Sequence, residues 1–174
     1  MLRLLGPIAF LAVPLSAQAL PPDDRAAINA SVHQFLIAYQ TGDADQMVAA
    51  MPPSYVSAHA RRVGLGPGFY RSLVVHFTEA ALTDGSIEEL EIDPGQLSVH
   101  RTPDGIEYGL IPTRSITSKH GMRMEMTSQT LALKDQGTWW LIQVNDDNQI
   151  SVLREVYPSF QSVAFDRPQK TQVE

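Results

Sequence analysis

The chain has 174 residues, of which 44% are hydrophobic and 18% are charged, a composition typical of a globular protein and unlike that of a disordered one. Its formal net charge is −6, and Arg61-Arg62 is its one adjacent basic pair, so the basic surface that nucleic acid or an anionic membrane requires is not expected. The sequence has no cysteine, which excludes disulfide bonds and thiol chemistry.

The N-terminus has the three parts of a secretory signal peptide. Arg3 supplies a positive charge, an apolar stretch runs from Leu4 to Leu15, and Ala17-Gln18-Ala19 offers the small residues of a cleavage site. The apolar stretch is shorter than the roughly 20 residues that a transmembrane helix needs. We therefore predict that residues 1–19 are a signal peptide. The mature protein is then exported, periplasmic or secreted, and soluble, with no membrane partner after cleavage.

Helical periodicity dominates the first half of the mature chain. Apolar residues recur at helical spacing from Ile28 to Tyr39 and again from Phe69 to Ala80. Gly42 and Pro52-Pro53 are typical of helix ends, and shorter helices are expected after Asp43 and over 55–63. The sequence thus predicts four helices before Gly85.

After Gly85 the apolar pattern changes to a period of two. Strands are predicted over 87–92, 97–101, 106–118, 122–134 and 138–145. The last three are joined by short turns that contain glycine, which predicts an antiparallel meander. Residues 150–157 fit a helix better than a strand, and both assignments remain open at this point. We assign residues 20–158 to one domain and 159–174 to a polar C-terminal tail that frays.

One strand carries an irregular pattern. Its apolar residues first occupy even positions, at Met122, Met124 and Met126, and then odd positions, at Leu131 and Leu133. Because side chains alternate between the two faces of a strand, this change requires an extra residue or a change of buried face. The sequence predicts a bulge or sharp bend within 127–130. A bent sheet can leave a cavity between itself and the helices.

Two segments carry a resemblance to a known superfamily. Residues 35–45, Phe-Leu-Ile-Ala-Tyr-Gln-Thr-Gly-Asp-Ala-Asp, and residues 137–142, Gly-Thr-Trp-Trp-Leu-Ile, resemble motifs of the nuclear transport factor 2-like superfamily. The likeness covers roughly residues 24–146. It implies an α+β cone fold, with N-terminal helices packed in the concave face of a curved, mostly antiparallel sheet. The superfamily includes isomerases, dehydratases, hydrolases and pure binding proteins, so the fold alone does not give a function.

The enzymes nearest in motif are the ketosteroid isomerases, which use a carboxylate base, a tyrosine and a protonated acid. The resemblance places these roles at His59, Phe35 and Gln129, respectively, so two of the three lack a suitable group. His59 remains the candidate catalytic residue, because an imidazole can act as a general base near neutral pH. The alternative, a solvent-facing histidine on a short helix, is the one we favour.

A set of aromatic and polar side chains forms the candidate ligand pocket. It comprises Tyr39, Tyr55, Tyr108, Arg114, Gln129 and Trp140. Arg114 shares a strand face with Ile106, Tyr108, Leu110 and Ile116. If that face is buried, its guanidinium requires an anionic partner, either a ligand carboxylate or Glu125, and we favour Glu125. The histidines lack the spacing that brings two imidazoles to one metal ion, and the alternate methionines are typical of core filling. No metal and no cofactor are expected.

These features favour an exported, non-catalytic domain that binds a small apolar ligand or a protein partner. One alternative is an enzyme of the isomerase, dehydratase or hydrolase kind with His59 as general base. Another is a structural or assembly protein that acts through the outer face of its sheet, including a homodimer formed through the sheet. A convergent set of polar groups in a deep pocket would separate the first two from the third.

Overall fold

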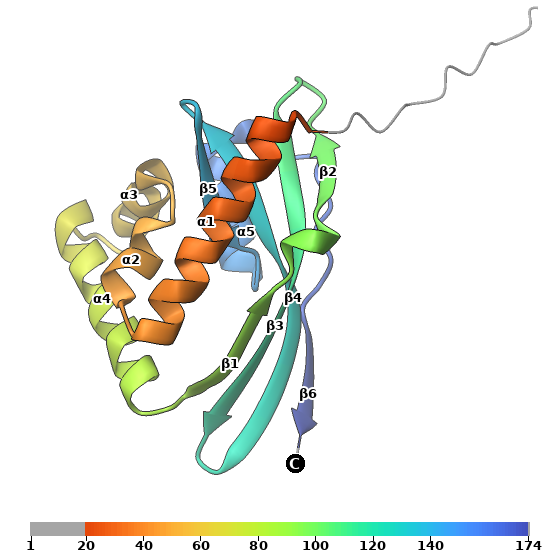
Figure 1. The fold of residues 1–174 in the computed structure, drawn as a ribbon. Coiled ribbons are helices and arrows are strands. Elements are labelled where there is room, and N and C mark those ends of the chain that lie inside the picture. Colours follow the sequence, from red (N-terminus) through yellow and green to blue (C-terminus); the bar gives the residue numbers. More distant parts are fainter. Residues whose placement is uncertain (1–19, 174) are drawn as a thin grey trace, which may run out of the picture.

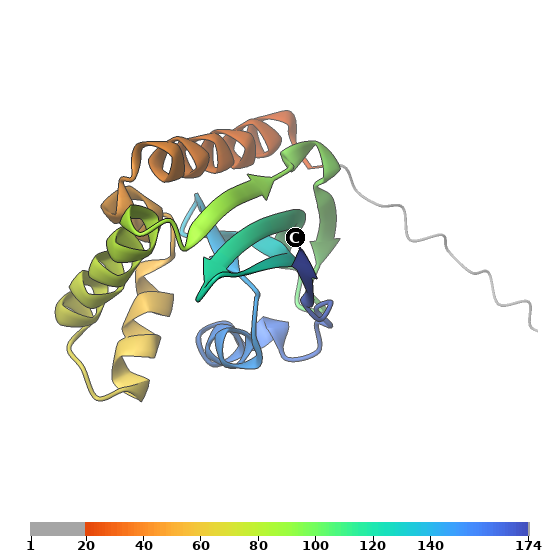
Figure 2. The ribbon, with the colours of Figure 1, turned by 90° about the horizontal axis from the view of Figure 1, so that it is seen from below.

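The structure is a computed structural model that describes residues 20–173, and the predicted signal peptide lies outside them. The predicted fold class is confirmed: helices of the N-terminal half pack against a strongly curled antiparallel sheet (Figure 1). The curled sheet forms a half-barrel, consistent with a cone-like fold, and Figure 2 shows α1 and α5 on opposite sides of it. Within residues 20–173, no helix combines the length and apolar character needed to cross a bilayer.

Within residues 20–173, four helices precede the first strand, as the periodicity predicts. They are α1 (Pro22–Thr41), α2 (Ala44–Ala49), α3 (Pro53–Arg62) and α4 (Pro67–Thr83). Three of them begin with a proline, whose missing N–H would find no partner in the first helical turn. Gly42 ends α1 in a left-handed conformation, and the Asp43 side chain caps α2 by accepting a hydrogen bond from the Gln46 amide.

Helix α4 packs less closely than its apolar stripe suggests. None of its residues is buried, and the Phe69 and Phe77 side chains are each 64% exposed. The helix packs mainly against α2 and α3. Because its neighbours lie on one side only, the rest of the stripe stays on the surface.

In the described part of the chain, six strands form one antiparallel sheet. They are β1 (Ile87–Ile92), β2 (Ser98–Arg101), β3 (Glu107–Lys119), β4 (Met122–Asp135), β5 (Thr138–Gln143) and β6 (Gln169–Val173). The order is β1-β3-β4-β5, with β2 also on β3 and β6 also on β4. A 3-10 helix, η1 (Pro94–Gln96), separates β1 from β2. The predicted meander is confirmed as β3, β4 and β5.

The two long strands change neighbours at the same level. On the edge away from β4, β3 pairs with β2 over 107–110 and with β1 over 113–117. On the edge away from β3, β4 pairs with β5 over 130–135 and with β6 over 123–127. The change occurs at Pro112, which is the register partner of Gln129. A proline has no N–H to donate, and it is tolerated there because neither β1 nor β2 pairs with this residue. The sheet thus has a β2–β5 half and a β1–β6 half.

Of the two alternatives predicted for residues 127–130 of β4, a bulge or a sharp bend, the bulge is wrong. The pairing of β4 with β3 is continuous from Leu133 to Met122, and the register shift of the sheet lies instead in β1, between Ile87 and Glu89. The apolar pattern changes phase because β4 is buried on both faces in the β2–β5 half. Ala132 packs against α1 on one face, while Leu131 and Leu133 pack under the C-terminal segment on the other.

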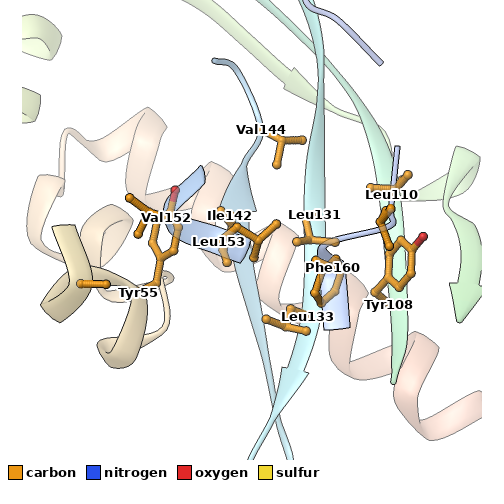
Figure 3. Close-up of a cluster of buried hydrophobic side chains, with 12 residues drawn as sticks. Tyr55, Tyr108, Leu110, Leu131, Leu133, Ile142, Val144, Val152, Leu153 and Phe160 are labelled. Atoms are coloured by element: carbon orange, nitrogen blue, oxygen red, sulfur yellow. The ribbon is translucent and has the colours of Figure 1, made fainter. Parts of the chain in front are cut away.

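Two apolar clusters cover the two faces of the β2–β5 half. On the face that meets the N-terminal helices, called the cavity face below, Ile28 and Val32 of α1 pack with Ile111, Ala132 and Trp139. On the outer face, the sheet is covered by α5 (Asp147–Val156) and η2 (Pro158–Phe160), as Figure 3 shows. This outer cluster includes Tyr108, Leu110, Leu131, Leu133, Ile142, Val152, Leu153 and Phe160. The helix favoured for 150–157 is confirmed as α5.

The segment after Pro158 is ordered, and the expectation that it frays is wrong. Phe160 has 0% of its surface exposed and Val163 has 8%. The Arg154 guanidinium donates hydrogen bonds to the carbonyl oxygens of Phe160 and Val163, and β6 then pairs with β4. Widely spaced apolar residues and backbone pairing hold this segment in place, although its composition is polar.

Candidate functional site

A cavity of about 320 Å³ lies between the helices and the cavity face of the sheet. Its volume corresponds to about ten water molecules at liquid density. Helices α1 to α4 and the link between α2 and α3 contribute Phe35, Met47, Val48, Met51, Tyr55, Val74 and Thr78 to its wall. The sheet and the segment after β5 contribute Ile87, Leu90, Ile92, Thr113, Ser115, Thr117, Met126, Ser128, Thr130, Leu141, Gln143, Asn145 and Gln149. The cavity is therefore built from elements spread over most of the described chain.

The floor of the cavity carries rows of hydroxyl groups. Thr113, Ser115 and Thr117 alternate along β3, and Ser128 and Thr130 do so along β4. Alternate residues of a strand share one face, so this spacing directs every one of these side chains to the same side. A strand with hydroxyls on the face that meets the helices gives a polar surface inside an otherwise apolar fold.

The floor hydroxyls differ in their hydrogen bonding. The Thr113 hydroxyl donates to the Ile111 carbonyl at 3.2 Å and lies 2.7 Å from the Thr130 hydroxyl, which therefore donates to it. Ser128 Oγ and Asn145 Oδ1, by contrast, are closed off from solvent and have no hydrogen-bond partner among residues 20–173. Leaving such a buried group unpaired costs about 1–3 kcal/mol.

The described wall of the cavity carries no formal charge at neutral pH. Its residues include no Asp, Glu, His, Lys or Arg within the part of the chain that the structure covers. Tyr55 is its titratable member, and burial raises the pKa of this hydroxyl well above the ordinary value. The Tyr55 hydroxyl donates to the Gln149 carbonyl at 3.3 Å. It is a fixed hydrogen-bonding group and not a base.

Two of the predicted pocket residues lie in or beside the cavity. Tyr55 is 3% exposed and lines it. Tyr39 does not line it, but its hydroxyl donates to the carbonyl of Ile87, a wall residue, at 3.4 Å. Phe35, which the resemblance placed at the tyrosine position of the isomerases, is also in the wall.

The remaining predicted residues lie outside the cavity wall. Tyr108 packs edge-on against Phe160 in the outer cluster, with ring centroids 5.0 Å apart. Gln129 points to the outer face, where its amide donates to Asp166 at 3.1 Å. Trp140 lines a separate groove beside α3. The structure therefore does not gather the predicted set around one ligand.

Arg114 is held on the outer face by acidic neighbours. Its guanidinium donates to Glu125 at 2.8 Å and to Glu89 at 2.7 Å. Of the two partners weighed for Arg114, the structure supplies Glu125, with Glu89 added from β1. No ligand carboxylate is needed to explain this arginine.

His59 lies on α3 between two tyrosines. Its ring meets Tyr55 edge-on at 4.7 Å and stacks on Tyr70 at 6.0 Å, both measured between ring centroids. It is half-buried and does not belong to the cavity wall. Burial, followed by the nearby Arg62 charge, lowers the pKa of the His59 imidazole. Among residues 20–173, no group of three His, Cys, Asp or Glu side chains could hold a metal ion.

We expect His59 to titrate below the ordinary histidine pKa of about 6.5. In the unfolded chain it then takes up its proton first, so the free energy of unfolding falls as the pH drops below about 6.5. An NMR titration of the imidazole Cε1–H resonance measures the midpoint, and His59→Gln assigns the signal and should flatten the pH dependence. A midpoint at or above 6.5 would contradict this environment.

The sequence did not single out the hydroxyl and amide groups that line the cavity. Ser115, Ser128 and Asn145 are neither titratable nor aromatic, and no motif in the sequence marks them. The available signal was the alternation of Thr113, Ser115 and Thr117 in a strand with apolar neighbours. That pattern marks a polar surface turned toward the helices.

The chain matches no protein-family model, no curated protein and no solved structure. Its function must therefore be inferred from the site described above. The site consists of a cavity, a hydroxyl-bearing floor and two buried polar atoms of its wall, Ser128 Oγ and Asn145 Oδ1, that lack partners within residues 20–173.

Proposed function

We propose that this protein is an exported, non-catalytic binding domain of the nuclear transport factor 2-like kind, which holds a small, mostly apolar ligand. The cavity of about 320 Å³ between helices and sheet carries this proposal, since ligand pockets of proteins begin at about this size. Export rests on the signal-peptide pattern, and the family on the two motifs together with the curled sheet.

Catalysis has less support than binding. A general base must come within hydrogen-bond reach of the substrate, and His59 is not part of the cavity wall. Tyr55, the titratable residue that does line the wall, keeps its proton at neutral pH. An enzyme that used His59 would have to bind its substrate outside this cavity.

Assembly through the outer sheet face also has less support. In the β2–β5 half, α5 and η2 already cover that face. In the β1–β6 half it carries the ion pairs of Arg114 with Glu89 and Glu125. A second copy docking there would have to desolvate these charges, which offsets much of the gain from burial.

Ser115→Leu tests the cavity. Leucine adds apolar atoms to an existing void, so we expect the free energy of unfolding to rise by about 1–2 kcal/mol, at about 0.8 kcal/mol per buried methylene. Native mass spectrometry of the protein purified from its own host should show a bound small molecule that this variant has lost. Ser118→Leu, on the same strand but outside the cavity wall, is the matched control and should keep it.

A site already filled by side chains would give the opposite result for Ser115→Leu. Where side chains fill a site completely, added bulk costs about 1–3 kcal/mol. A destabilised Ser115→Leu variant, together with a wild-type mass equal to that of the chain alone, would contradict the proposal.

A further inference from the structure

We infer that the ligand is uncharged and carries a hydroxyl or amide head group that donates a hydrogen bond to Asn145 and pairs with Ser128, while its apolar body lies along the methionine side of the cavity. This inference rests on the proposed binding function and specifies the chemistry of the same site. It starts from the two buried polar atoms without a partner.

Ser128 and Asn145 are neighbours across the sheet. Thr130 of β4 pairs with Gln143 of β5, and the Val144 amide donates to the Gln129 carbonyl at 3.1 Å. Continuing this register by one more step places Asn145 opposite Ser128. Both residues line the cavity, and on the strength of this register we treat their unpartnered atoms as one polar spot.

The other polar atoms around Asn145 are engaged. Its side-chain amide donates to Gln143 Oε1 at 3.0 Å, and its backbone amide donates to Gln149 Oε1 at 2.7 Å. These two bonds hold the residue in place and leave Oδ1 as an acceptor. A carbonyl oxygen can only accept, so its partner must bring an N–H or O–H group.

Ser128 fits the same head group. Its hydroxyl can donate or accept, so it can pair with whichever atom of the head group remains. The nearby Thr113 and Thr130 hydroxyls already satisfy each other. Buried side-chain atoms without a partner also include Gln129 Oε1, but Gln129 is not in the cavity wall, so within the described wall the deficit lies at Ser128 and Asn145. Both atoms are closed off from solvent, so binding of the head group requires the Ser128 and Asn145 side chains to turn toward the cavity.

The rest of the wall selects an apolar, uncharged body. Apolar wall residues include Phe35, Met47, Met51, Leu90, Met126 and Leu141. Methionine side chains adapt to irregular shapes, which suits a ligand of moderate size. An ion would be costly to bury there, because none of the described wall residues carries an opposite charge.

Methionine methyl groups report occupancy directly. With ¹³C-methyl methionine, a bound ligand should shift the signals of Met47, Met51 and Met126, which line the cavity. Met122 is 53% exposed and outside the wall, so its signal serves as an internal control. Four probes with the same body separate the head groups: 4-phenylbutan-1-ol, its methyl ether, butylbenzene and 4-phenylbutanoate.

We expect the alcohol to bind about fivefold more tightly than the ether or butylbenzene, the gain from one net hydrogen bond. The carboxylate should bind at least about 100-fold more weakly than the alcohol. Asn145→Leu should remove the preference for the alcohol, and exposed Asn148→Leu should keep it. Ser128→Ala, a smaller change, should reduce the preference about twofold if the leucine variant does not fold.

Two outcomes overturn the inference and leave the binding function intact. One is a preference for the alcohol that persists in both Asn145→Leu and Ser128→Ala. The other is tighter binding of the carboxylate, the ether or butylbenzene than of the alcohol. If no probe shifts any of the three cavity methyl signals, the proposed binding function itself fails, and this inference fails with it.

Discussion

Replacing Phe160 with alanine should lower the free energy of unfolding by about 3–5 kcal/mol, the usual cost of removing a large buried aromatic side chain. Phe160 is fully buried, and its ring contacts Tyr108 at 5.0 Å and Phe165 at 6.3 Å between centroids. It belongs to the outer cluster, where it lies among Tyr108, Leu131 and Leu133 (Figure 3). The variant would leave a void between sheet and helix that the surrounding side chains cannot fill. Chemical denaturation monitored by tryptophan fluorescence measures the loss.

Phe165→Ala is the matched control, because Phe165 is partly buried at the edge of the same cluster. Its loss should be smaller, since fewer apolar atoms leave contact. A Phe160→Ala loss below about 1 kcal/mol would mean that the segment after Pro158 does not pack in solution. It would then behave as the frayed tail that its composition suggests.

Two isosteric changes on the cavity floor should act in opposite directions. Thr113→Val removes the acceptor of the Thr130 hydroxyl, and Thr130 is a buried residue with 1% of its surface exposed. We therefore expect the free energy of unfolding to fall by about 1–3 kcal/mol. Ser128→Ala removes a hydroxyl that has no partner within residues 20–173, so the unliganded protein should be unchanged or slightly more stable.

Thermal and urea unfolding of both variants, freed of ligand, measure this contrast. Thr113 and Ser128 are register partners on neighbouring strands. If any substitution on the cavity floor destabilised the protein, both variants would therefore lose stability equally. A Ser128→Ala loss as large as that of Thr113→Val would show that Ser128 has a bonding partner. The polar spot would then not be free to receive a ligand.

The architecture was largely predictable because its signals are local. The spacing from Ile28 to Tyr39 and the left-handed Gly42 define α1 and its end. Turns at Gly121 and Gly137, both with positive φ, define the β3-β4-β5 meander. Each of these features depends on residues close together in the sequence.

The errors arose where distant segments decide burial. Leu131 and Ala132 are both buried because α5 covers one face of β4 and α1 covers the other, which single-strand periodicity cannot express. The β6 sequence, Gln-Lys-Thr-Gln-Val, has exposed side chains except at Val173, so its place in the sheet depends on backbone pairing. No side-chain pattern marks such a strand.

The candidate site was the least predictable part. Tyr55 was found because it is aromatic and follows the helix break at Pro52-Pro53. Ser128 and Asn145 come together only through the β4–β5 register, and their lack of partners is a property of the folded chain. Arg114 stood out in the sequence, and its partners Glu89 and Glu125 come from strands on either side of it.

The late position of β6 in the chain has a consequence for biogenesis. One edge of β4, from Arg123 to Thr127, waits for a strand that begins only at Gln169. Until residues 169–173 have been made, the growing chain presents a row of free amides and carbonyls to any passing strand. A chaperone that keeps the polypeptide extended until β6 has been synthesised would protect that edge from pairing with another molecule.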